Sequence, residues 1–148
     1  SKLIGDLFRD VAVPVLCLES YLYDDLYMSG SDRNSDYGNS RRRRTIAVTD
    51  SGQSLSAGMS DSVKVTTRRR RVGWGVPTDA AIIIARLTDR SERAAIFAYK
   101  KGAPMANGYP APENRIGMFL HGNSAPRLTA AGWELFDAAV KWAIAEQN

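Results

Sequence analysis

The chain has 148 residues, of which 44% are hydrophobic and 24% charged, which is typical of one folded domain with its own core. No apolar run approaches the roughly 20 residues that span a bilayer, so no membrane span is expected. A single cysteine, Cys17, excludes an intramolecular disulfide and a cysteine-built metal cluster, and a single histidine, His121, excludes the usual multi-histidine zinc sites. We expect one domain over residues 1–148, with no cofactor. The net charge of +4 is local, because eight of the 20 basic residues lie in two runs. The rest of the chain has 12 basic residues against 16 acidic ones.

The first predicted elements surround an apolar run. Leucine, isoleucine and phenylalanine at helical spacing predict that Lys2–Asp10 is the end of a helix. Val11–Leu18 is continuously apolar, which is typical of a buried strand inside a parallel sheet. Ser20–Met28 is predicted to form one or two helical turns, and residues 29–40, "SGSDRNSDYGNS", a loop.

Four short strands are predicted next, beginning at Thr45, Ser62, Ala80 and Ala94, and a further buried strand runs from Arg115 to His121. A helix capped by Thr129 ends the chain. This order predicts an α/β fold: a sheet with helices packed on it and an antiparallel β extension.

Two segments resemble a known family. "PVLCLESYLYDDL", residues 14–26, resembles the nucleophile-elbow strand of class I glutamine amidotransferases, and "MFLHGN", residues 118–123, resembles the segment that completes their Cys-His-Glu triad. The wider pattern, including "WGVP" and "GWELFDAAVKWA", is similar to a divergent branch with trehalose-utilisation-type domains and flavodoxin-like modules of secreted bacterial proteins. The resemblance implies a flavodoxin-like, amidotransferase-like sheet over nearly the whole chain.

The catalytic positions depart from that family. Glu19 stands at the elbow where the family has its cysteine, His121 matches the histidine, and Asn123 stands where the glutamate would be. A thiolate nucleophile needs an adjacent imidazole and a third group that orients it. The resemblance therefore implies a degenerate site, and a non-enzymatic structural or binding module. An alternative is a hydrolase in which Glu19 and His121 form an acid–base pair; the same two side chains could instead keep a buried structural hydrogen bond.

Family members usually begin with a strand–helix–strand portion before the elbow strand, so the resemblance implies an N-terminally shortened domain or a fragment of a longer protein. A buried-type strand without those neighbours needs cover. We expect a second copy, a separate polypeptide or a strand from the middle region to supply it, with self-assembly or membership of a larger bacterial extracellular protein or assembly as the role.

The two arginine runs suggest another role. Guanidinium groups repel one another and bind phosphates, sulfates or carboxylates, so a polyanion site for nucleic acid, an acidic polysaccharide or an acidic neighbouring subunit is one interpretation, and solvated loop tips are the other. Tyr37 and Trp74 are near enough in sequence to stack on bases or sugars. The candidate polyanion-binding residues are Arg41, Arg42, Arg43, Arg44, Arg68, Arg69, Arg70 and Arg71.

"DRNSDYG", residues 32–38, has oxygen-bearing side chains at alternate positions, as calcium loops do, which makes Asp32, Asn34 and Asp36 a weak metal candidate. The glycine comes one place late, and Arg43 stands where such a loop ends in glutamate. A plain Asp/Asn/Gly turn fits the segment better.

Overall fold

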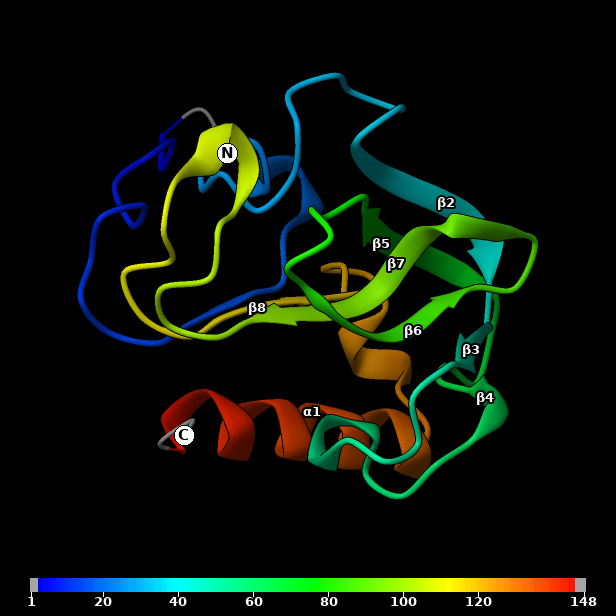
Figure 1. The fold of residues 1–148 in the computed structure, drawn as a ribbon. Coiled ribbons are helices and arrows are strands. Elements are labelled where there is room, and N and C mark those ends of the chain that lie inside the picture. The colour runs from blue at the N-terminus through cyan, green and yellow to red at the C-terminus, as the bar shows by residue number, and fades with distance from the viewer. Residues whose placement is uncertain (1–2, 146–148) are drawn as a thin grey trace.

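The computed structural model describes residues 3–145, which form one mixed sheet of eight strands and one α-helix (Figure 1). The strands are β1 (Val15–Cys17), β2 (Tyr37–Arg43), β3 (Thr45–Val48), β4 (Asp61–Lys64), β5 (Arg70–Gly75), β6 (Ile82–Leu87), β7 (Arg90–Tyr99) and β8 (Arg115–Met118). The helix is α1 (Ala130–Ile144), and the 3-10 turns are η1 (Ser20–Leu22), η2 (Ser54–Ser56), η3 (Ala106–Gly108) and η4 (Ala125–Arg127).

The sheet is built around β7. The main path runs β1-β8-β7-β6-β3-β4, while β5 pairs with β7 and β2 pairs with β5. Within residues 3–145 the β1–β8 pair is the parallel one, and the other strand pairs are antiparallel. The chain is therefore an α/β fold with a largely antiparallel sheet. No helix of the described part is long and apolar enough to cross a bilayer.

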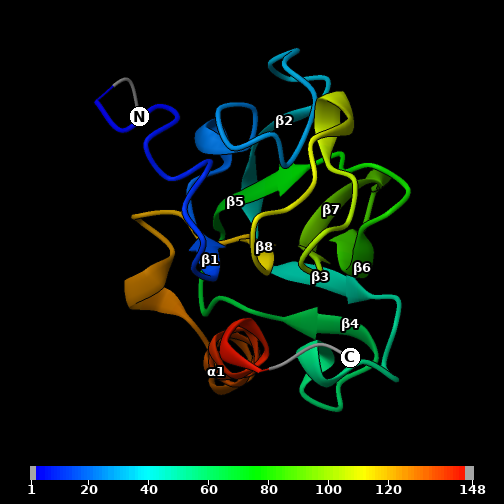
Figure 2. The same ribbon diagram turned by 60° about the vertical axis from the view of Figure 1, so that its left-hand side comes forward.

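Both faces of the sheet are covered. α1 lies on one face, and the N-terminal segment and the loops around η1 lie on the other (Figures 1 and 2). Successive side chains of a strand point to opposite faces, so Ile96 and Ala98 of β7 join the core against α1, while Phe97 and Tyr99 join the core under the loops. The expected helices packed on the sheet are represented by one α-helix in the described residues.

Two N-terminal predictions were wrong. The described part of the predicted helix, residues 3–10, forms turns, since Gly5 at φ +47° interrupts helical geometry there. The strand predicted over Val11–Leu18 is limited to Val15–Cys17. It is the first strand in the order of the sheet and therefore lies at an edge, not in the interior. Pro14 has no N–H to contribute to a ladder, and Val13 is 57% exposed.

The strands predicted from Thr45, Ser62, Ala80, Ala94 and Arg115 are confirmed as β3, β4, β6, β7 and β8. The C-terminal helix is confirmed too, and the Thr129 hydroxyl accepts a hydrogen bond from the Gly132 N–H at 3.0 Å. β2 and β5 were missed, because their polar and arginine-rich halves have no apolar alternation. The arginine runs therefore extend into strands, although the sequence placed them in loops.

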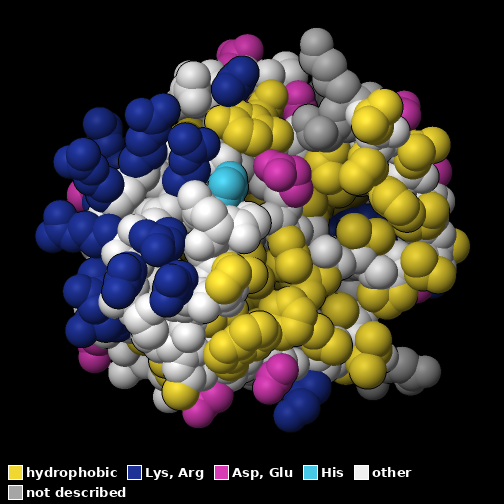
Figure 3. Space-filling view, turned by 180° about the vertical axis from the view of Figure 1, so that it is seen from behind, with side chains coloured by type: hydrophobic (Ala, Val, Ile, Leu, Met, Phe, Trp, Pro, Cys, Tyr) yellow, Lys and Arg dark blue, Asp and Glu magenta, His cyan; other side chains and the backbone are white. Residues whose placement is uncertain are grey.

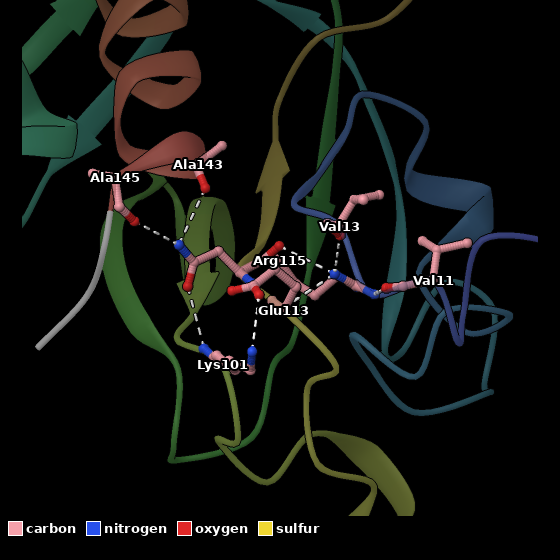
Figure 4. A network of polar contacts seen from close by, with 8 residues as sticks. Val11, Val13, Lys101, Glu113, Arg115, Ala143 and Ala145 are labelled. Atoms are coloured by element: carbon pink, nitrogen blue, oxygen red, sulfur yellow. Dashed lines mark hydrogen bonds and ion pairs between the residues drawn. The ribbon is translucent and has the colours of Figure 1, made fainter.

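A buried arginine joins the N-terminal segment to the sheet. Arg115 begins β8 with its side chain fully buried, and its guanidinium donates to the carbonyl oxygens of Arg9, Val11 and Val13 at 3.3, 2.7 and 2.9 Å. It also donates to the carbonyl oxygens of Glu113 and Asn114, both at 3.2 Å. Figure 4 shows the guanidinium between β8 and the N-terminal segment.

The neighbouring residue joins the sheet to the helix. The Asn114 amide nitrogen donates to the carbonyl oxygens of Ala143 and Ala145 at 3.1 and 3.2 Å, where α1 ends (Figure 4). Its amide oxygen accepts the Lys101 N–H at 3.2 Å. The last carbonyls of a helix have no partner within it, so Asn114 supplies a donor at the end of α1, to the buried Ala143 and to the exposed Ala145.

We predict that Arg115→Met lowers the free energy of unfolding by about 2–4 kcal/mol, because five backbone carbonyl oxygens lose the donor that the buried guanidinium supplies. Hydrogen exchange should accelerate most in residues 9–15. The control is Arg90→Met, at an exposed arginine, which should stay within about 0.5 kcal/mol of the parent. Urea titration measures the stability of the two variants, and hydrogen exchange measures the protection of residues 9–15. Unchanged exchange in residues 9–15 of Arg115→Met would contradict this role of Arg115.

Candidate functional site

Two candidate sites lie at different places on the sheet. The first is the edge where the parallel strands β1 and β8 end, which carries Glu19 and His121 just beyond them. Glu19 is the N-cap of η1, and its carboxylate accepts the Tyr21 N–H at 3.2 Å. The Glu19 carboxylate therefore stabilises a turn.

His121 makes its contacts within a local turn. Its Nδ1 lies 3.2 Å from Oδ1 of Asn123 and 3.3 Å from the Asn123 backbone nitrogen. Its backbone N–H donates to the Ser124 hydroxyl at 2.8 Å. In one tautomer Nδ1 accepts the Asn123 N–H, and in the other it donates to the Asn123 side chain.

Glu19 and His121 share an edge but not a contact. Within residues 3–145 no hydrogen bond or ion pair joins them, and both side chains are partly exposed. The buried Glu–His hydrogen bond considered from the sequence was wrong, because each group is already paired with its own turn. In this arrangement neither side chain holds the other for proton transfer.

The nearest thiol belongs to the core. Cys17 is 5% exposed, and its Sγ donates to the Glu19 carbonyl oxygen at 3.3 Å. Burial raises the pKa of the Cys17 thiol to about 12, and the nearby Glu19 charge adds to the rise. A thiol with this pKa stays protonated at neutral pH, as a structural cysteine does.

The acidic loop at residues 32–36 is a turn. The Asp36 carboxylate accepts the Asp32 N–H at 2.9 Å, and the Asp36 N–H donates to the Asp32 carbonyl at 2.7 Å. Asn34 has φ +67°, and its N–H donates to the Tyr37 carbonyl at 2.8 Å. In the described residues no group of three or more histidine, cysteine, aspartate or glutamate side chains is placed to hold a metal.

The second candidate site consists of the arginines 41–44 and 68–71, called the arginine face below. β2 and β5 pair antiparallel, and their register sets Arg43 opposite Arg70. Tertiary pairing thus brings together two runs that are far apart in the sequence. Figure 3 shows basic side chains gathered on the side of the molecule where β2 and β3 lie.

A β-bulge shapes this face. The register steps from Ser40↔Val72 to Arg43↔Arg70, so Arg41 and Arg42 together lie opposite Arg71. Arg42 has φ +57°, a left-handed conformation that costs a non-glycine residue of the order of 1 kcal/mol. The bulge turns the strand where the arginines begin, so their side chains do not follow the regular alternation of a ladder.

Few acceptors neutralise the arginine face. Arg43 forms an ion pair with Asp89 at 2.5 Å, and this bond lowers the pKa of the Asp89 carboxyl. Arg44 donates to the Thr67 carbonyl at 3.0 Å, and Arg70 donates to the Arg69 carbonyl at 3.0 Å. The other five side chains make no hydrogen bond or ion pair with any residue from 3 to 145 and are exposed: Arg41, Arg42, Arg68, Arg69 and Arg71.

The aromatic residues expected to stack beside the arginines are inside the protein. Trp74 is 2% exposed, with the Arg93 guanidinium carbon 3.9 Å from its ring centroid. Tyr37 is 7% exposed, and its hydroxyl donates to the Asp24 carboxylate at 3.0 Å. The prediction that they stack on bases or sugars was wrong, because β2 and β5 turn both rings into the core.

Sequence reasoning missed two residues that matter here. Asp89, the counter-ion of Arg43, lies in the β6–β7 turn, 46 residues away, and nothing in the sequence connects the two. Arg115 could have been recognised in the sequence, because it is a charged residue at the start of an apolar strand. A charge in that position indicates a buried side chain with fixed acceptors.

Comparison of the chain with protein-family models, curated proteins and solved structures gave no match. The resemblance to amidotransferases therefore stays a prediction, and the function is argued from the residues themselves.

We predict that Cys17 reacts slowly with a thiol reagent in the folded protein at pH 8, at least about 100-fold more slowly than in denaturant, because the thiolate is scarce and buried. The pKa of Cys17 in the folded protein, about 12, lies above the ordinary cysteine value of 9.0. The stability that Cys17 contributes is therefore complete below about pH 9 and is lost as the pH rises towards 12. Rates measured with and without urea test this. Fast labelling of the folded protein would mean an accessible, activated thiol.

Proposed function

We propose that this chain is a non-enzymatic binding module that holds polyanions on its arginine face. The observation that carries the proposal is the pairing of β2 with β5, which opposes Arg43 and Arg70 across the ladder. Like charges directly opposite each other destabilise a sheet, and Asp89 is the one carboxylate of the described residues in contact with the eight arginines. A bound polyanion would remove this repulsion.

The state of the side chains supports the same function. Five of the eight guanidinium groups are exposed with no partner among residues 3–145, so a polyanion need not break existing bonds. Arginine binds phosphate and sulfate oxygens in a bidentate manner. The stacking rings are buried, which favours contact with the charged backbone of a polymer over recognition of its bases or sugars.

We also propose that the fold is a divergent, flavodoxin-like relative of the amidotransferases whose catalytic residues are lost. The parallel pairing of β1 with β8 supports this, since it brings the elbow position and His121 to one sheet edge. The turn-capping role of Glu19 and the buried, protonated Cys17 support the absence of catalysis.

Binding of a duplex DNA of about 20 base pairs should weaken steeply with salt, because arginines that contact phosphates release counterions. Replacing the three exposed arginines Arg68, Arg69 and Arg71 by glutamine should reduce the slope of log K against log salt by about 2–3. Fluorescence anisotropy at several salt concentrations measures this.

The matched control replaces three exposed lysines outside the arginine face, Lys100, Lys101 and Lys141, by glutamine. It removes the same formal charge and should change the slope by less than about 1. An equal reduction of the salt slope in the two triple variants would mean that net charge alone, and not the arginine face, determines DNA binding. Absence of binding to both DNA and heparin at low salt would reject the polyanion function.

A second candidate function is self-assembly through the apolar surface beside β1. Ile4, Leu7, Phe8, Val13 and Leu18 are between 37% and 69% exposed there. A hollow of about 530 Å³ lies among the N-terminal segment, β1 and η1. Figure 3 shows extended apolar surface on the side away from the basic residues. A strand at the end of the sheet with exposed apolar side chains beside it offers a second copy both backbone pairing and area to bury.

If this surface joins copies of the chain, light scattering should give a dimer or larger species that survives about 1 M salt, where the Debye length is roughly 3 Å. Val13→Ser should shift the equilibrium towards monomer. Val140→Ser, at a residue of α1 that is 39% exposed, is the control and should not. A monomer at low and high salt would reject assembly through the β1 surface.

A further inference from the structure

The arginine face contains a defined hollow. Its volume is about 410 Å³, within the range of about 300–1,000 Å³ of small-molecule sites. It is lined by four arginines and two threonines from four parts of the fold: Arg42, Arg43, Arg44, Thr45, Arg69 and Thr88. β2, β3, the segment before β5 and the β6–β7 turn therefore meet around one concentration of positive charge.

Two of the lining arginines are already fixed in place. The Arg43 Nη2 contacts Asp89 at 2.5 Å, and the Arg44 Nη2 donates to the Thr67 carbonyl at 3.0 Å. These bonds hold one end of each guanidinium, so less conformational entropy remains to be lost when an anion binds.

The same two side chains carry donors without acceptors. The Nε atoms of Arg43 and Arg44 are buried and have no hydrogen-bond partner among residues 3–145. A buried N–H without an acceptor costs of the order of 1–3 kcal/mol. Guanidinium groups that are fixed in place and line one hollow suit a ligand with several oxygen acceptors.

We propose that this hollow is a specific site for a compact oligophosphate group, the phosphate chain of a nucleotide or of inorganic polyphosphate. The inference rests on the proposed polyanion function and names the ligand chemistry of one part of the arginine face. Four guanidinium groups match a ligand that has several negative charges in a small volume. A single sulfate ester or phosphodiester group carries only one negative charge and fits the hollow less well. Thr45 and Thr88 belong to the same lining, and threonine is a residue whose hydroxyl can donate to phosphate oxygens.

The test uses the whole chain with inorganic tripolyphosphate as the probe, followed by calorimetry and by NMR of the arginine Nε–Hε signals. We expect the Arg43 and Arg44 signals to shift on addition of tripolyphosphate, and not with sulfate at the same ionic strength. Adenosine triphosphate is the second probe. Equal affinity for both probes supports recognition of the phosphate chain alone, and tighter binding of adenosine triphosphate supports a nucleotide as its source.

Matched double variants separate the hollow from general charge. Arg42→Gln with Arg69→Gln removes two lining arginines whose side chains make no hydrogen bond or ion pair with residues 3–145. Arg41→Gln with Arg71→Gln removes the same charge from the same face outside the lining. We expect the Kd for tripolyphosphate to rise at least about tenfold in the first and less than about threefold in the second.

Equal weakening in both double variants, or equal Arg43 and Arg44 shifts with sulfate, would overturn the oligophosphate site. If duplex DNA or heparin still binds in that case, the proposed polyanion function stands without it. If neither polymer nor tripolyphosphate binds, both proposals fall. Urea titration of each variant shows whether it is folded.

Discussion

The buried guanidinium of Arg115 is the interaction on which the layering of this protein depends. Five backbone carbonyl oxygens accept from it, three of them in the N-terminal segment at Arg9, Val11 and Val13. Its neighbour Asn114 binds the end of α1 on the other side of the sheet. Two consecutive residues thus hold three layers together. Burial lowers the pKa of Arg115, but arginine remains charged in proteins. The buried charge is therefore tolerated because the carbonyl oxygens around it accept its hydrogen bonds.

The arginine face represents the opposite electrostatic situation. The Nη atoms of Arg115 are hydrogen-bonded to five carbonyl oxygens, while the arginines of β2 and β5 are crowded, and three of them (Arg41, Arg42 and Arg71) have no hydrogen bond or ion pair with residues 3–145. A bulge at Arg42, the ion pair of Arg43 with Asp89 and exposure to water make the crowding tolerable. Exposed ion pairs of this kind add little stability, and this is the ground for the binding role proposed above. The edge beyond β1 and β8 shows the reverse, since Glu19 and His121 are each used by a local turn.

Much of the fold could be predicted from short-range pattern. Runs of β-branched and apolar residues identified β3, β4, β6, β7 and β8, and the Thr129 cap identified the start of α1. β2 and β5 could not be found in this way, because only part of each strand is buried in the core. Each strand is also held by hydrogen bonds to the other, which the sequence does not show. The apolar run before Glu19 was misjudged for a related reason. Composition indicates that residues can be buried, whereas neighbours decide whether they are.

For the candidate sites, the sequence by itself determined the chemistry: eight clustered arginines, one cysteine, one histidine and a glutamate directly after an apolar run. Only the tertiary structure decided how these groups meet. Strand pairing set Arg43 against Arg70, and the β6–β7 turn supplied Asp89. The fold also buried Trp74 and Tyr37, and it gave Glu19 and His121 hydrogen bonds within their own turns. The physical reason is range: charge and hydrophobicity belong to single residues, but register, burial and counter-ions come from segments that are distant in the chain and meet only in the fold.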